Sequence, residues 1–251
     1  MKHLLIFVYC TLNVVLSNEL MISKESQQFH SYSTKSSLKT KIGYKKCLSS
    51  VPSYVYATVK ATESSLPHTF NVTVLGVKES YFEVELKRTD VSEGWNMFVT
   101  VDWKMYTGDF IVVNNKAIWL PDVFTVTDLN RENATMDCYK REGQLVEVAD
   151  KRSFTMVYDY VRNKFQFGKQ EFVDFWLGSS YNPRTSQVLQ SNGEPGYNEG
   201  WYPDDFPKQK PGLTGIILRV AAPDLTRNHG MGNLVPDSLH TVIKLCALEI
   251  N

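Results

Sequence analysis

The chain has 251 residues, of which 27 are basic and 27 acidic, so its formal net charge at neutral pH is zero. A chain without net charge has no overall field that would draw it to nucleic acid or to an anionic membrane, and we expect neither as a partner. The hydrophobic share of 43% is ordinary for a globular protein, and the length fits one large all-β domain or two small ones.

Residues 1–17 have the pattern of a secretory signal peptide. Lys2 and His3 form a short polar start, residues 4–16 are mostly apolar, and a cleavage point follows Ser17. The alternative is a buried N-terminal strand. The apolar stretch is too short for a membrane helix, and no later run approaches the roughly 20 apolar residues that such a helix needs. We therefore expect a secreted, extracellular protein made of residues 18–251, with no membrane span.

Two glycosylation sequons agree with secretion. They begin at Asn71 and Asn133, and each has a threonine at the required third position. Asn71 is expected on the solvent face of a strand, opposite Phe70 and Val72, because side chains alternate between the two faces of a strand.

The cysteine count is odd once the signal peptide is removed. Cys47, Cys138 and Cys246 remain, which allows one bridge and leaves one thiol. An intermolecular bridge or three buried thiols are the alternatives, and all of these arrangements stay open at the level of the sequence.

Residues 18–50 are polar and weakly periodic, which predicts a short helix or an ordered arm. From Tyr54 onward, apolar and polar side chains alternate with a period of two, which is typical of half-buried strands. Stretches rich in glycine and proline at 182–212 and 223–236 predict long loops, and we expect the second to close over a ligand. The expected strands lie within 54–59, 70–74, 81–87, 97–103, 145–148, 172–176, 213–220 and 240–250. No repeat or linker interrupts them, so one all-β domain is predicted over 18–251.

One short run resembles a known family. It reads Ile118-Trp119-Leu120-Pro121-Asp122 and follows Trp103. Both tryptophans are expected in the core, Pro121 is expected to set a turn, and Asp122 is expected to hydrogen-bond to neighbouring backbone. The run resembles the extracellular ligand-binding domain of Cys-loop receptors, the pentameric ligand-gated ion channels.

Two further segments carry the same resemblance. Tyr158 and Phe172 are separated by the same spacing as the family's two loop cysteines, with Phe154 four residues before. Two aromatics at those positions can pack where a bridge would close the loop. The segment 236–245 resembles the family's last strand, and the chain ends at Asn251, as in the soluble acetylcholine-binding proteins.

The resemblance implies an immunoglobulin-like β-sandwich of about ten strands after a short N-terminal helix. It also implies a homopentamer that binds a small molecule between subunits, without a metal or cofactor. Ser180 replaces the family's tryptophan, and the family's aromatic box is largely lost, so we expect a non-cholinergic, more apolar ligand. The ligand-binding residues implied are Phe98, Phe124, Val126, Cys138, Val146, Val148, Trp176, Ser180, Tyr181 and His229.

Three rival classes are considered beside this one. No nucleophile elbow, P-loop or zinc-protease motif is found, so an enzyme is not expected. A secreted carbohydrate-binding β-sandwich lectin would share the strands at 70–74 and 81–103, but gives no reason for the aromatic spacing at 154–172. The third rival is the outer domain of a channel subunit.

Overall fold

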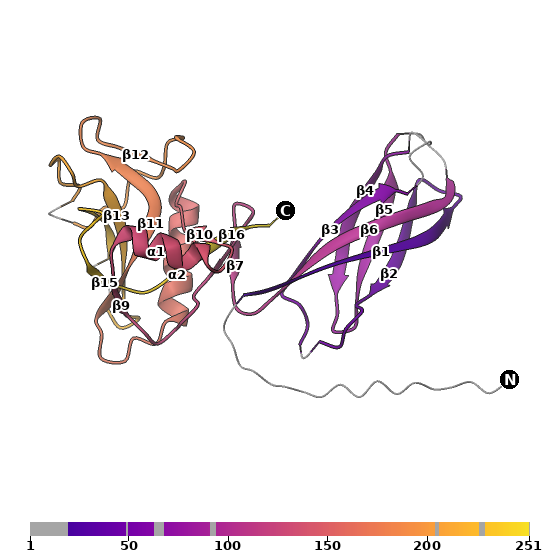
Figure 1. The fold of residues 1–251 in the computed structure, drawn as a ribbon, viewed down its shortest axis with the longest axis horizontal. Coiled ribbons are helices and arrows are strands. Elements are labelled where there is room, and N and C mark those ends of the chain that lie inside the picture. Colours follow the sequence, from indigo (N-terminus) through magenta and orange to yellow (C-terminus); the bar gives the residue numbers. More distant parts are fainter. Residues whose placement is uncertain are drawn as a thin grey trace. The chain divides into compact units, whose positions relative to one another are not determined.

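The computed structural model describes residues 20–48, 50–62, 68–90, 94–203, 206–225 and 229–250 (Figure 1). The predicted signal peptide, residues 1–17, lies outside the described residues. Contacts along the chain divide the protein into two compact units, Met1–Gly108 and Asp109–Asn251. One domain over 18–251 is predicted from the sequence, whereas the contacts separate the chain into these two units.

The described residues of the first unit form two antiparallel sheets of three strands each. Its strands are β1 (Met21–Ser33), β2 (Ser37–Gly43), β3 (Tyr54–Ala61), β4 (Phe70–Val77), β5 (Tyr81–Arg88) and β6 (Trp95–Thr107). One sheet has the order β1-β6-β3 and the other has the order β2-β5-β4. The last four strands lie where the alternation of side chains predicts them.

The core of the first unit lies between its two sheets. Val84 and Leu86 of β5 are fully buried together with Val99 and Val101 of β6. Trp103, one of the two tryptophans predicted in the core, is also buried, with its ring 5.4 Å from that of Phe82 on the opposite sheet. On the outer side of β4, Asn71 is exposed while its neighbours pack toward this core, as expected for that sequon.

The N-terminal segment forms strands where a helix or arm is predicted, and that prediction was wrong. β1 pairs with β6 over its whole length, from Met21 opposite Thr107 to Ser33 opposite Trp95. Its sequence has few apolar residues, and one inward-facing position is a serine, Ser31, which accepts a hydrogen bond from the Trp95 indole at 3.1 Å. The strand is therefore specified by its partner and not by a hydrophobic period of its own.

The second unit contains two helices and three sheets within its described residues. The sheets have the orders β10-β16-β8-β7, β12-β11-β13-β14 and β15-β9. The elements are β7 (Ile111–Val113), β8 (Lys116–Trp119), β9 (Thr127–Leu129), α1 (Arg131–Tyr139), β10 (Gln144–Leu145), α2 (Lys151–Lys164), β11 (Phe172–Asn182), β12 (Gln187–Leu189), β13 (Gly215–Ala221), β14 (Gly230–Leu234), β15 (His240–Val242) and β16 (Cys246–Glu249).

Helix α2 has clear signals in the sequence that the strand-based interpretation missed. Asp150 caps its first turn and forms a capping box with Ser153. Buried Val157 and Val161 then follow at helical spacing, and they belong to the same core cluster as Phe175 of β11. The buried side of helix α2 therefore packs with side chains of β11 in the core of the second unit.

The predicted fold class is right only in its coarse form. The described part of the chain is mostly β-structure, but it has two short helices and several separate sheets in place of the expected immunoglobulin-like sandwich with an N-terminal helix. Trp103 and Trp119 are both buried, as predicted, yet they belong to different units. The expected last strand is also divided, into β15 and β16.

Candidate functional site

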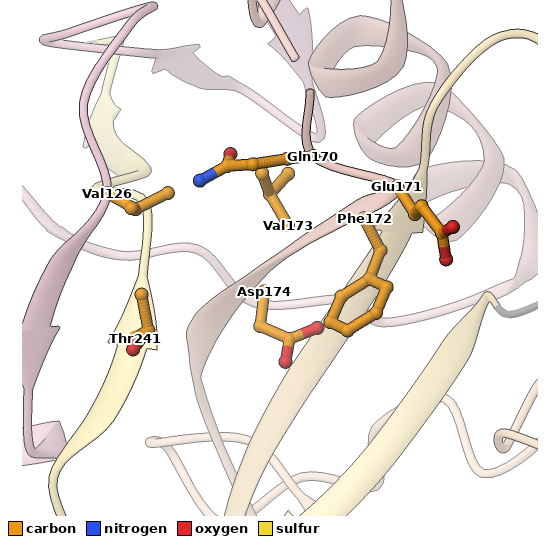
Figure 2. A pocket seen from close by; sticks show the side chains of 7 residues that line it. All are labelled: Val126, Gln170, Glu171, Phe172, Val173, Asp174 and Thr241. Atoms are coloured by element: carbon orange, nitrogen blue, oxygen red, sulfur yellow. The ribbon is translucent and has the colours of Figure 1, made fainter. Parts of the chain in front are cut away.

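The second unit has a pocket at the start of β11. Its cavity volume is about 310 Å³, within the range usual for small-molecule sites. Its walls come from three separate parts of the chain. The lining residues are Val126, Gln170, Glu171, Phe172, Val173, Asp174 and Thr241 (Figure 2). We call this cavity the Phe172 pocket.

The Phe172 pocket has two opposite walls. Val126, just before β9, and Thr241 of β15 form one wall, and Phe172 and Asp174 of β11 form the other (Figure 2). The side-chain amide of Gln170 points toward Val126 (Figure 2). The pocket thus lies between β11 and the two-stranded sheet of β9 and β15.

Asp174 is the buried charge of the pocket, with a side chain only 2% exposed. Arg219 of the neighbouring strand donates to its two oxygens at 2.8 and 2.9 Å, and His240 Nε2 lies 2.7 Å from Oδ2. Burial alone would raise the pKa of this carboxyl, but hydrogen bonds from Arg219 and then His240 outweigh it and hold the pKa below its usual value. Asp174 is therefore an ionised, fully engaged group.

Phe172 presents a partly open aromatic ring. It is 39% exposed, and the guanidinium carbon of Arg219 lies 3.9 Å from its ring centroid. The same guanidinium lies 5.5 Å from the ring centre of Tyr202. Arg219, which is held by Asp174, therefore covers part of the Phe172 ring, and the rest of the ring stays partly exposed at the pocket.

The polar groups at the rim are available for hydrogen bonds. The Gln170 side chain is exposed, and an amide can both donate and accept. The Thr241 hydroxyl donates to the Asp128 carboxylate across the β9–β15 pair, which leaves its lone pairs free to accept. The pocket thus combines apolar walls with a few fixed polar groups, the usual composition of a binding site for a small molecule.

Of the ten predicted ligand-binding residues, the structure brings Val126 alone to the pocket. Phe98 lies in the first unit, where it is 45% exposed and its ring contacts that of His30. Phe124 is 72% exposed. It lies in a turn in which the Asp122 carboxylate accepts hydrogen bonds from the backbone amides of Phe124 and Thr125. Ser180 lies in β11 and His229 stands beside the Tyr158 ring. Cys138, Val146, Val148, Trp176 and Tyr181 are buried in the second unit.

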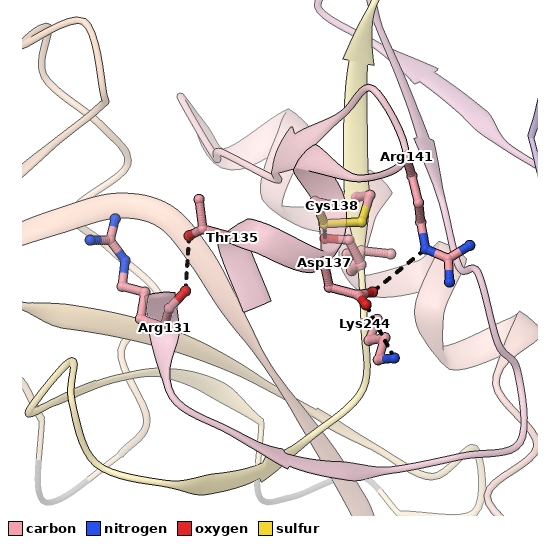
Figure 3. The surroundings of a disulfide bond; sticks show 8 residues. Arg131, Thr135, Asp137, Cys138, Arg141 and Lys244 are labelled. Atoms are coloured by element: carbon pink, nitrogen blue, oxygen red, sulfur yellow. Dashed lines mark hydrogen bonds and ion pairs between the residues drawn. A yellow bond between two sulfur atoms is a disulfide. The ribbon is translucent and has the colours of Figure 1, made fainter. Parts of the chain in front are cut away.

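Cys138 is bound in a disulfide, which settles its pairing. It joins α1 to β16 through Cys246, with the two Cα atoms 5.5 Å apart (Figure 3). Asp137 beside it pairs with Arg141 and Lys244, each at 3.5 Å (Figure 3). An intramolecular bridge was one of the arrangements that the sequence had left open. Such bridges are typical of oxidising compartments, which agrees with an extracellular location.

Most of the pocket was missed at the level of the sequence, although one signal was present. Asp174 interrupts an otherwise apolar run, Phe172 to Leu177, that the sequence predicts as a strand. A carboxylate in a buried strand needs a charged partner and often marks a functional site. Gln170 and Thr241 carry no comparable signal.

The described residues give two further negative findings. They contain no group of three or more histidine, cysteine, aspartate or glutamate side chains that could hold a metal ion. Neither helix of the described chain has the length and apolar character needed to cross a membrane.

Comparison of the sequence with protein-family models finds no match, and comparison with curated proteins finds none. Comparison of the structure with solved structures does find similar ones. The carbohydrate-recognition domain of the mouse scavenger receptor C-type lectin is 14% identical, with a TM-score of 0.38 over 57% of this chain and 94% of that one. The C-type lectin CEL-I from Cucumaria echinata is 14% identical, with a TM-score of 0.41 over 58% and 98%. Herring type II antifreeze protein is 12% identical, with a TM-score of 0.40 over 57% and 98%.

These findings contradict the predicted resemblance to Cys-loop receptors and acetylcholine-binding proteins, which was wrong, since the similar structures are C-type lectins and an antifreeze protein. The geometry gives the physical reason. Tyr158 lies in α2 and stacks on Phe154, whereas Phe172 lies under Arg219, so the two do not close a common loop.

The predicted homopentamer falls with the resemblance, because it rested on that resemblance alone. The ligand-contact roles of the remaining predicted residues stay predictions, without the family pattern that implied them.

Proposed function

We propose that the protein is an extracellular binding protein whose second unit takes a neutral carbohydrate in the Phe172 pocket and does not transform it. The observation that carries this proposal is the pairing of a partly exposed aromatic ring with hydrogen-bonding side chains around one cavity. The proposal concerns the second unit only, and it assigns no ligand to the first.

The ring of Phe172 suits the less polar face of a sugar. A pyranose has faces of C–H groups and edges of hydroxyls, so it can pack on an aromatic ring while its hydroxyls remain at the rim. Val126 and Val173 add further apolar surface to the same cavity. Burying this surface contributes about 25 cal/mol per Å², enough for weak binding of a small ligand.

The polar groups supply the orientation. Gln170 can donate to and accept from hydroxyls, and the Thr241 oxygen can accept from one. A site that is built to hydrogen-bond a hydroxyl rejects analogues without it, because its own polar groups are then left unpaired. Asp174 takes no direct part, since Arg219 and His240 occupy its oxygens.

The two walls of the pocket are also joined to each other through Asp174. Arg219 fixes the Phe172 ring and His240 ties β15 to β11 through the same carboxylate. Preorganised walls reduce the entropy lost on binding, which favours affinity in a small site. The predicted signal peptide, the two sequons and the Cys138–Cys246 bridge all fit a place outside the cell.

The test is binding of the purified full chain to a glycan array, followed by titration calorimetry with the best neutral saccharide. Phe172→Ala should lower the affinity at least about tenfold, because it removes the main apolar wall. Phe98→Ala is the matched control, since Phe98 is a similarly exposed phenylalanine, 45% against 39%, in the first unit.

Two outcomes would reject the proposal. One is an array without any carbohydrate signal above background for the wild-type chain. The other is a carbohydrate signal that Phe172→Ala leaves unchanged, because the ligand would then be held outside the Phe172 pocket.

A further inference from the structure

We propose that His240 is a positioning residue of the Phe172 pocket. Through Asp174 it holds the β9–β15 ribbon, Thr127–Leu129 and His240–Val242, at a fixed distance from β11. The inference about binding rests on the proposed function. The inference about the position of the ribbon does not, and it can be tested without a ligand.

The β9–β15 ribbon is too short to keep its place alone. It consists of three residue pairs, His240 with Leu129, Thr241 with Asp128 and Val242 with Thr127. An isolated two-stranded ribbon is at best marginally stable in water. Its position must therefore come from what it is docked on.

Three polar contacts dock the ribbon on β11. His240 Nε2 lies 2.7 Å from Asp174 Oδ2, the backbone amide of Ile243 donates to the Asp174 carbonyl at 2.8 Å, and the Trp176 indole donates to the Leu129 carbonyl at 2.9 Å. Of the three, only the first joins a ribbon side chain to a charged group. Hydrogen bonds to charged groups are stronger than those between neutral groups.

The ribbon carries one wall of the pocket. Val126 directly precedes β9, and Thr241 directly follows His240 in β15. A shift of the ribbon relative to β11 would therefore move both residues relative to Phe172. The width of the pocket depends on where the ribbon is docked.

The same carboxylate fixes the opposite wall. Asp174 Oδ1 and Oδ2 accept from Arg219, whose guanidinium lies 3.9 Å from the Phe172 ring centre. Asp174 therefore connects Phe172, through Arg219, with Thr241, through His240. Removing the hydrogen bond from His240 should release one wall and leave the other in place.

The first experiment is hydrogen exchange of the full chain in three variants. His240→Ala should speed exchange of the backbone amides in 127–129 and 240–243 at least about tenfold, while those of β13 change little. His240→Gln, whose side-chain amide can donate to Asp174, should restore most of the protection. His30→Ala is the control, since His30 also contacts an aromatic ring, that of Phe98, but lies in the first unit.

His240→Leu distinguishes the effect of losing the hydrogen bond to Asp174 from the effect of losing side-chain volume. It also keeps the test decisive if His240→Ala fails to fold. It retains an apolar side chain against Trp176, whose ring centroid lies 6.4 Å from that of His240, but it cannot donate. We expect fast exchange in this variant. Protection equal to that of His240→Gln would overturn the proposal, as would wild-type exchange rates in His240→Ala.

The second experiment is calorimetry with the neutral saccharide selected by the wild-type protein. His240→Leu should bind it at least about tenfold more weakly, and His240→Gln within about threefold of wild type. Equal affinity for all three proteins would overturn the positioning role. If the wild-type chain binds no saccharide, the proposed function fails, while the exchange rates still decide whether His240 holds the ribbon.

Discussion

Arg219 lies across the ring of Phe172, with its guanidinium carbon 3.9 Å from the ring centroid. Asp174 lies opposite Arg219 on the adjacent strand β11. It orients the planar guanidinium by accepting hydrogen bonds from two of its N–H groups. Arg219 is thus held both by its ion pair with Asp174 and by its contact with the Phe172 ring. The open side of Phe172 is therefore available to a ligand, while its covered side is not.

Arg219→Met should destabilise the second unit by about 3–5 kcal/mol, because it leaves the buried Asp174 carboxylate without its charged partner. Arg219→Lys should fall between this variant and the wild type, since it keeps the charge but not the two-point contact. Urea denaturation of the three proteins measures the loss. In the double variant Asp174→Asn, Arg219→Met, part of the stability should return, and a fully additive result would contradict the coupling.

The stability of the second unit should fall in acid through Asp174. Its pKa in the folded protein is lowered, so its contribution is present above the unfolded value of about 4 and is lost as the pH falls through the folded value. The free energy of unfolding of the wild type minus that of Asp174→Asn should shrink as the pH falls below about 4. In this difference the contributions of other carboxyls with lowered pKa values, such as Asp122 and Asp150, cancel because both proteins contain them. A difference that grows as the pH falls below about 4 would contradict the assignment.

The strands of the first unit were predictable where their own side chains alternate. Phe82, Val84 and Leu86 point inward in turn, and β5 follows from them directly. β1 has no such period, since its ladder with β6 extends through polar residues such as Gln27 and Gln28. The position of β1 is therefore determined largely by its pairing with β6. A pattern within the β1 sequence alone cannot predict this pairing.

The pocket could not be predicted because its walls meet only in three dimensions. Val126, Phe172 and Thr241 are far apart in the sequence, and they come together through the pairing of β15 with β9 and the docking of both on β11. Val126 does line the pocket, but it was predicted from a resemblance that was wrong. Its place in the pocket therefore does not support that resemblance. Asp174 was the one local clue, a charge inside an apolar strand.

Removing the Cys138–Cys246 bridge should cost the second unit about 4–5 kcal/mol, the value expected from chain entropy for a loop of this length. The bridge closes a sequence separation of 108 residues and ties α1 to β16. The measurement is urea denaturation of the double variant Cys138→Ala, Cys246→Ala against the wild type without reductant. An unchanged midpoint for the second unit would mean that the bridge contributes little.

Carbohydrate binding in the Phe172 pocket should not require divalent cations. A calcium ion takes six to eight oxygen ligands, whereas the pocket offers the carboxylate of Glu171 and that of Asp174, which Arg219 and His240 already engage. Array binding measured with and without a chelator such as EDTA should give the same pattern. A signal lost in EDTA and restored by calcium would place the bound sugar on a different part of the chain.

Gly230→Ala should loosen the attachment of the segment around Trp201 to β14. Gly230 has a φ of +139°, and an added Cβ would lie 2.7 Å from the Tyr202 amide nitrogen and 2.9 Å from the Gly200 oxygen. These are backbone atoms that also form the hydrogen bonds between 200–202 and Met231, so they cannot move aside without breaking them. We expect a loss of about 1–3 kcal/mol and faster proteolysis near Trp201. Gly76→Ala is the control, because a Cβ there meets nothing within 4 Å. Equal proteolysis of the two variants would show that the close approach at Gly230 is not what holds this segment.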